Sequence, residues 1–182
     1  MGDTGNTLPI ISREIKKLEK IIAQQSWLNQ VEPLVMLSLV VSGAKPGATL
    51  PAWFTKKETI RFQKLLTKLK LAHQVLPFIP PKTGKKVWII DVAKNADWLN
   101  KFNSRNISDG TYYGYPECCQ RAFEKRRSKP PKAPFPLNFV GLVPCRPRCA
   151  NAMALALAYK KVITNVLSPI KFSEFRSFWE KV

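Results

Sequence analysis

Two lysine-rich stretches carry apolar residues at a helical spacing. Residues 9–25 place theirs on one face, and residues 55–70 repeat the pattern. The apolar stripe of the second stretch consists of Phe62, Leu65, Leu66 and Leu69. We predict two amphipathic helices that bury these stripes. The cations on the remaining faces are interpreted as a solvated surface, although those of residues 55–70 could also follow phosphates.

Three other apolar stretches predict strands. Residues 34–41 form a short run rich in branched side chains, which favours a buried strand, with a helix as the alternative. Residues 74–79 and 86–92 flank turn-forming prolines and a glycine, which indicates an antiparallel hairpin. Residues 44–54 between the first strand and the next helix are predicted to be a loop.

The rest of the chain has a helical pattern. We predict a short helix over 93–103, a long one over 150–166 and a final aromatic one from about residue 173. The first half of 150–166 is apolar all round, so it belongs in the core or an interface. Together these elements predict an α+β fold: a small antiparallel or mixed sheet of about three strands covered by helices, with a helical C-terminal half.

We interpret residues 1–182 as a single domain, because 182 residues at 45% hydrophobic content suit one core. Residues 1–33 would supply an N-terminal helix and connector, 34–113 an α/β scaffold, and 114–182 a helical part that carries the cysteine motifs.

Charge suggests a partner. Thirty lysines and arginines against twelve acidic residues give a formal net charge of +18. Such a surface suits RNA or DNA, although a lysine-favouring composition would produce it as well. The sequence shows no secretory signal, and its longest apolar run is too short for a bilayer. We therefore expect a cytoplasmic protein without a membrane partner.

All four cysteines fall in two groups, residues 115–119 and 144–149. Each group lies where a helix is expected to begin, with Pro116 and Pro147 suited to the first helical position. A helix N-terminus and nearby arginines favour the thiolate, which binds metals and attacks electrophiles. Clustered cysteines in a reducing compartment more often mean metal or thiol chemistry than a disulfide framework.

Three interpretations of Cys118, Cys119, Cys145 and Cys149 remain open. They could hold a metal, either zinc or an iron–sulfur cluster; they could form a redox pair or disulfide; or they could only pack. The groups lack the Cys-x2-Cys spacing of common zinc sites. Adjacent residues on a helix also point about 100° apart, so we expect Cys118 and Cys119 to reach one small ion with difficulty.

No standard catalytic set is evident, and the sequence leaves open whether the protein is an enzyme. His73 is the only histidine and is interpreted as a surface or capping residue. Cys118, Cys145 and Glu117 are the candidate catalytic residues, with Glu117 as a possible proton carrier. Glu117 would also complement a helix N-terminus.

Cations surround the cysteine groups. A proline-rich connector follows the first group, and arginines lie within or beside both groups. These residues could guide an anionic substrate or a nucleic acid, or form only a solvated linker. The candidate anion-binding residues are Lys125, Arg126, Arg127, Lys129, Lys132, Arg121, Arg146 and Arg148.

Residues 114–119, then Phe123, then Pro144-Cys145-x3-Cys149 before an alanine- and leucine-rich helix, form a recognisable pattern. It resembles the signature of an uncharacterised archaeal and bacterial domain family, Gly-Tyr-Pro-x-Cys-Cys-x-x-Phe followed by Pro-Cys-Ser-x-x-Cys. The resemblance covers roughly residues 34–165 and implies a shared cysteine site, without an activity to carry over. Arg146 stands where the family often has serine, and the connector is more basic than the family suggests.

The leading functional hypothesis is a metal- or iron–sulfur-binding protein that contacts nucleic acid. A thiol- or redox-dependent enzyme acting on a small anionic substrate is the runner-up. The third hypothesis is a basic interaction module in which a disulfide joins two helices.

Overall fold

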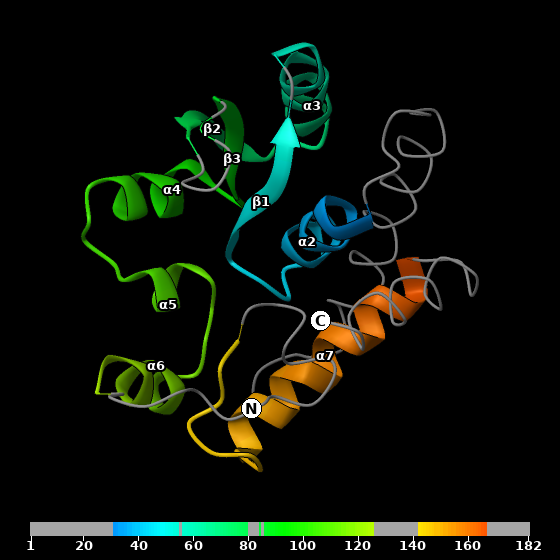
Figure 1. Ribbon diagram of the computed structural model, residues 1–182. Coiled ribbons are helices and arrows are strands. Elements are labelled where there is room, and N and C mark those ends of the chain that lie inside the picture. The colour runs from blue at the N-terminus through cyan, green and yellow to red at the C-terminus, as the bar shows by residue number, and fades with distance from the viewer. Residues whose placement is uncertain (1–30, 55, 80–83, 85, 126–141, 167–182) are drawn as a thin grey trace.

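The computed structural model describes residues 31–54, 56–79, 84, 86–125 and 142–166. These residues contain a three-stranded sheet and six helices, and Figure 1 shows their arrangement. The predicted α+β class is confirmed. The helices expected over 9–25 and from residue 173 lie outside the described residues, as does most of the basic connector.

The sheet is antiparallel with strand order β1-β3-β2, where β1 is Gly47–Phe54, β2 is Ala72–Phe78 and β3 is Val87–Ala93. The hairpin predicted over 74–79 and 86–92 is confirmed as β2 and β3. Central β3 pairs with both neighbours, so Leu50, Ile90 and Val75 form one row across the sheet. That row faces the main core, because side chains alternate between the two faces of a strand.

The prediction of a strand over 34–41 is wrong, because this run lies within helix α2, Val31–Val41. Helix α2 contacts β1 on one side and helix α7, Ala150–Val166, on another. Six consecutive positions, 35–40, are buried. A helix satisfies its backbone hydrogen bonds internally, so it can be surrounded by apolar neighbours, and a short apolar run does not distinguish it from a strand.

The prediction of a loop over 44–54 is also wrong. After Lys45 and Pro46 the chain forms β1, which occupies one edge of the sheet. The strand contains Pro51, and a proline is tolerated on an edge strand, where an amide hydrogen bond need not be made. The pairing is irregular between Leu50 and Phe54, which brackets that proline.

Helix α3, Lys56–Lys68, confirms the helix predicted over 55–70 and buries Phe62, Leu65 and Leu66 in the main core. The opposite face of the sheet packs against helix α4, Ala96–Asn103, and the single turn α5, Asp109–Tyr112. Helix α4 begins three residues later than predicted, because β3 continues through Ala93 and Asn95 caps the helix with its side chain.

Tyr112 fixes α5 beneath the sheet. Its hydroxyl donates a hydrogen bond to the Val92 carbonyl at 2.7 Å, and its ring stacks on Phe102 at 3.9 Å between centroids. Gly47 is needed opposite, since a Cβ there would meet the Tyr112 ring at 2.5 Å.

Helix α6, Glu117–Glu124, lies beyond α5, and α7 packs against α2 (Figure 1). Helix α7 has the bounds that the sequence predicted. One of its faces, with Ala152, Ala156, Tyr159 and Ile163, is buried in the main core, whereas Leu157 on another face is 62% exposed.

Candidate metal centre

The first cysteine group enters α6 through a tightly held turn. Gly114 has φ +71°, and a Cβ there would meet Pro46 Cδ at 2.6 Å, so the position favours glycine. The Pro116 carbonyl accepts hydrogen bonds from the amides of Cys119 and Gln120 at 2.8 and 3.1 Å. Pro116 therefore caps the helix, one residue before the position expected for it, and Glu117 begins α6.

Gln120 joins α6 to α5. Its side-chain nitrogen donates to the Tyr115 carbonyl at 2.6 Å, and its oxygen accepts from the hydroxyls of Ser108 and Thr111 at 3.1 Å each. These three bonds orient the first turn of α6, where Cys118 and Cys119 lie.

The second cysteine group is a turn in front of α7. The Cys149 amide donates to the Arg146 carbonyl at 3.2 Å, and the Cys149 carbonyl accepts from the Met153 amide at 2.9 Å. Helix α7 begins at Ala150, so the expectation that Pro147 opens the helix is wrong; Pro147 belongs to the turn. Cys149 immediately precedes the helix and Cys145 lies at the start of the turn.

The two groups meet. All four sulfur atoms lie within 4.8 Å of one another. Cys118 Sγ is 3.9 Å from Cys119 Sγ and 3.7 Å from Cys149 Sγ, and Cys119 Sγ is 3.8 Å from Cys149 Sγ. All four cysteines are free thiols. The predicted set of four ligands is therefore brought together, and it can hold a metal ion.

The expected difficulty for adjacent cysteines is not found. Although successive Cα–Cβ bonds on a helix diverge by about 100°, the side-chain torsions of Cys118 and Cys119 turn both sulfurs toward Cys149. Cys149 comes from the other group, so the geometry depends on the approach of the turn before α7 to α6 as well as on local sequence.

Backbone and side-chain donors surround the sulfurs. The amides of Cys145 and Ala152 donate to the sulfurs of Cys119 and Cys149, respectively. The Asn151 side-chain nitrogen lies 3.7 Å from Cys118 Sγ. Hydrogen bonds of this kind orient metal ligands and stabilise their negative charge.

These surroundings shift the pKa values of the thiols in different directions. Burial raises the pKa of Cys119 to about 12, although the hydrogen bond from the Cys145 amide lowers it. Burial would also raise the pKa of Cys149, but the Ala152 amide and contacts with the other three thiols lower it to about 7. Contact with Cys149 raises the pKa of Cys145. Of these three thiols, Cys149 is therefore the first to ionise, and it lies at a helix N-terminus, where negative charge is favoured.

The predicted charged residues lie on the outside of this centre. Glu117 Oε1 is 3.7 Å from Arg121 Nε, and both side chains are mostly exposed. Arg146 and Arg148 project from the exposed turn between the second pair of cysteines, and Lys125 ends α6 in solvent. Arg126, Arg127, Lys129 and Lys132 lie outside the described residues. The catalytic roles considered for Cys118, Cys145 and Glu117 stay predictions.

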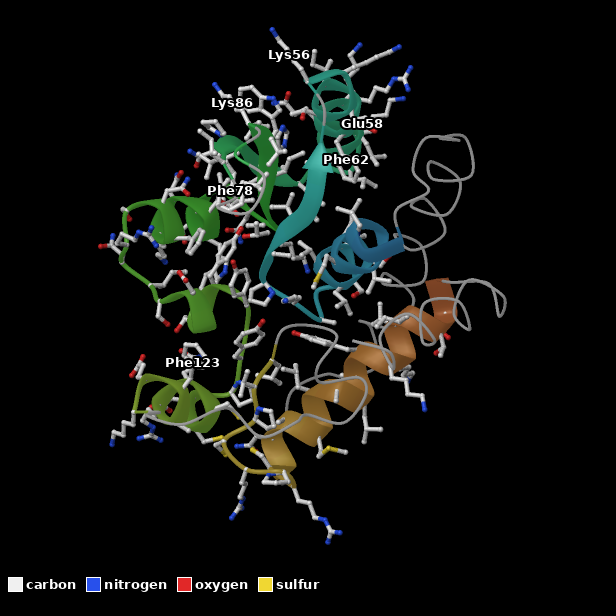
Figure 2. All side chains as sticks on the ribbon, viewed as in Figure 1. Lys56, Glu58, Phe62, Phe78, Lys86 and Phe123 are labelled. Atoms are coloured by element: carbon white, nitrogen blue, oxygen red, sulfur yellow. The ribbon has the colours of Figure 1, made fainter. Side chains whose placement is uncertain are left out.

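A cavity of about 400 Å³ adjoins the centre. Cys119 contributes to its wall, together with residues 108–110 from α5 and residues 142–143. Tyr113, Tyr115 and Phe123 supply aromatic surface. Figure 2 shows Phe123 on α6, and this side chain is 61% exposed.

Sequence reasoning missed Lys45. It precedes β1 and is only 1% exposed, with its ammonium 5.1 and 5.3 Å from the ring centres of Tyr113 and Tyr115. Tyr113 also joins the sheet: its hydroxyl is 2.9 Å from Thr49 Oγ1, which donates to Asp91 at 2.5 Å. A Lys-Pro-Gly sequence ordinarily signals an exposed turn, so only the three tyrosines of residues 112–115 hinted at a buried aromatic cluster.

None of the helices in the described ranges is long and apolar enough to cross a membrane. No family model matches the sequence. No curated protein and no solved structure matches it either. A function can therefore be inferred only from the geometry of the centre and the charge of the surface.

Proposed function

We propose that this is a zinc protein with a structural four-cysteine centre, and that its basic surface contacts nucleic acid. The observation that carries the first part is the convergence of four free thiols within 4.8 Å.

The sulfur separations support zinc. Zinc binds thiolates at about 2.3 Å in a tetrahedron, which places its ligand sulfurs about 3.8 Å apart. The three short separations among Cys118, Cys119 and Cys149 are 3.7, 3.8 and 3.9 Å. Cys145 Sγ lies within 4.8 Å of the other three sulfurs, and its side chain is half-buried at the start of the exposed turn.

The same distances argue against the other interpretations. In an iron–sulfur cluster the cysteines bind different iron atoms, so the ligand sulfurs are spread around a larger body. A disulfide would need one pair at about 2.05 Å, whereas the closest pair described is 3.7 Å apart. Four sulfur ligands also fill the tetrahedron and leave no open position for substrate, which favours a structural role over a catalytic one.

A structural role also fits the elements involved. Helix α6 has eight residues, and Cys119 is its only buried side chain. Isolated helices shorter than about 12 residues are marginal in water. A metal that binds Cys118 and Cys119 on α6 and Cys149 at the start of α7 would hold α6 in place, and this ordering is what structural zinc provides.

The nucleic-acid part of the proposal is supported by charge. The net charge of +18 gives a field that attracts polyanions. Exposed cations occur both on the turn with Arg146 and Arg148 and on the outer face of α3.

Metal analysis and an absorption spectrum of anaerobically purified full-length protein test the metal. We expect one zinc per chain and no visible absorption, and a cobalt-substituted sample should show the bands of a tetrahedral thiolate site. Cys145→Ser should lower the zinc content, whereas Arg148→Gln, in the same turn but without a ligand atom, should retain it.

Bound iron with visible absorption would overturn the zinc assignment, and inorganic sulfide bound together with the iron would identify a cluster. A metal-free protein that forms a disulfide in mild oxidant would favour the thiol or redox hypothesis. Failure of the zinc-loaded protein to bind DNA or RNA at low salt would reject the nucleic-acid part alone.

A further inference from the structure

The outer face of α3 carries a continuous row of cations. Lys57, Arg61, Lys64 and Lys68 are all exposed and recur at positions i, i+4, i+7 and i+11. At 100° and 1.5 Å per residue, the row covers an arc of about 60° and a length of about 16 Å. Figure 2 shows nitrogen-tipped side chains spreading outward from α3 at the end of the molecule marked by Lys56. We call these four residues the α3 row.

In the α3 row, positions one helical turn apart carry charges of the same sign, unlike the ion-paired turns of α4 and α6. Helix α4 pairs Lys101 with Asp97 at 2.9 Å, and α6 pairs Arg121 with Glu117 at 3.7 Å, each across one helical turn. In α3 the corresponding neighbours are Lys57 with Arg61 and Lys64 with Lys68. Like charges at this spacing destabilise a helix by about 0.2–0.5 kcal/mol per pair. The like-charged spacing of the row therefore does not by itself stabilise the helix.

The location of the row restricts its partner. The apolar face of α3 is already used, since Phe62, Leu65 and Leu66 are each no more than 3% exposed. A membrane-bound amphipathic helix needs that face free to enter the lipid. Within residues 56–68, Ile60 is the only large apolar side chain that is exposed. A lipid surface is thus disfavoured.

The same residues favour a duplex over a single strand. Proteins that bind single strands combine cations with aromatic side chains on which unpaired bases stack. The exposed positions of α3 contain no aromatic residue. A duplex stacks its bases internally and presents a row of phosphates, with successive charges about 3.4 Å apart along each strand. A straight row of cations over about 16 Å complements that backbone.

We propose that the α3 row binds the phosphate backbone of a double-stranded nucleic acid, independently of sequence. This inference rests on the proposed nucleic-acid contact and gives it a location. In Figure 1, α3 and the cysteine centre lie at opposite ends of the molecule. The contact therefore leaves the metal ligands and the turn with Arg146 and Arg148 free.

Fluorescence anisotropy with zinc-loaded full-length protein and a labelled DNA duplex tests the inference, with a duplex RNA and a single strand for comparison. The test variant is Lys57→Gln/Lys64→Gln/Lys68→Gln. The control variant, Lys125→Gln/Lys160→Gln/Lys161→Gln, removes the same charge from exposed sites on α7 and the end of α6. Both variants should retain zinc and the wild-type circular dichroism spectrum.

Each phosphate contact contributes about 0.9 to the slope of log K against log salt, so loss of three should reduce its magnitude by about 2.7. Between about 50 and 200 mM salt, wild-type affinity should therefore fall about 40-fold more than that of the test variant. The control should keep nearly the wild-type slope. We expect the DNA or RNA duplex to bind more tightly than the single strand, and the stronger duplex identifies the source of the phosphates.

An equal reduction of the salt slope in the control and test variants would overturn the inference, because net charge rather than the α3 row would then decide binding. The choice of partner would be overturned if the single strand bound more tightly than either duplex, or if polyglutamate bound as tightly as the duplex. If binding depends on Arg146 and Arg148 instead, the proposed function stands and this location is wrong. If nothing binds while zinc is retained, the nucleic-acid contact fails and the metal assignment survives.

Discussion

Replacing buried Lys45 by methionine should stabilise the protein at neutral pH. The Lys45 ammonium lies 3.9 Å from Met36 Sδ and over the rings of Tyr113 and Tyr115, and no described carboxylate pairs with it. Burial lowers its pKa from 10.5 to about 8, because desolvation disfavours the charged form. Methionine has a similar length and carries no charge into this site.

The magnitude follows from that pKa. A lowering from 10.5 to about 8 corresponds to about 3 kcal/mol lost at neutral pH, at about 1.4 kcal/mol per pH unit. The two cation–π contacts offset part of this loss, since each contributes about 0.5–2 kcal/mol. We therefore expect Lys45→Met to raise the free energy of unfolding at pH 7 by about 1–3 kcal/mol.

The advantage of methionine should shrink as the pH rises. Between the folded pKa of about 8 and the unfolded value of 10.5, the unfolded chain binds more protons than the folded one, so the wild-type protein gains stability with pH. From pH 7 to 9.5 the difference between variant and wild type should fall by about 2 kcal/mol. Comparing the two proteins at each pH cancels the titration of the tyrosines and cysteines.

Urea denaturation in saturating zinc at pH 7, 8, 9 and 9.5 measures the effect. Exposed Lys94→Met is the matched control and should give a small difference that does not vary with pH. A Lys45→Met protein that is less stable than wild type at pH 7 would show that the tyrosine rings hold the ammonium with a net gain. A difference that stays constant with pH would refute the claim that this lysine is destabilised by burial.

Two further predictions concern packing and metal. Gly47→Ala should lower the free energy of unfolding by about 1–3 kcal/mol, because its Cβ would lie 2.5 Å from the Tyr112 ring, which the Val92 carbonyl and the Phe102 ring hold in place. Thermal melts measure this effect, and a melting temperature equal to that of wild type would contradict the packing around α5. Removing zinc with a chelator should increase hydrogen exchange in α6 first and leave β3 protected, because α6 buries only Cys119. Unchanged protection of the α6 amides would show that the metal does not hold this helix.

Elements with clear periodicity could be predicted from the sequence, and those decided by their surroundings could not. The apolar stripe of α3 and the turn residues between β2 and β3 specify those elements locally. Helix α2 and strand β1 were predicted with the wrong structure. The 34–41 run is apolar all round, and Pro51 resembles a loop residue until the edge position of β1 is known.

The sequence predicted which residues form the candidate site but not how they are arranged. Residue type and the two helix starts indicated all four cysteines. Spacing alone argued against one small ion, because it ignores the side-chain torsions and the approach of α7 that bring Cys149 to Cys118 and Cys119. Lys45 was missed because its burial results from contacts with Tyr113 and Tyr115, 68 and 70 positions later in the chain.

The place of Cys149 immediately before α7 has a consequence for synthesis on the ribosome. Helix α2 buries its apolar surface against β1 and α7 together, so that surface stays open until residues 150–166 have emerged. The last sulfur of the centre emerges just before them. Because chains fold as their segments are released, from the N-terminus onward, closure of the core and capture of the metal should fall at the same late step. If the centre holds zinc as proposed, a cell short of zinc would accumulate chains whose core is closed but whose α6 is not held in place, and chaperones and proteases recognise such partly ordered chains.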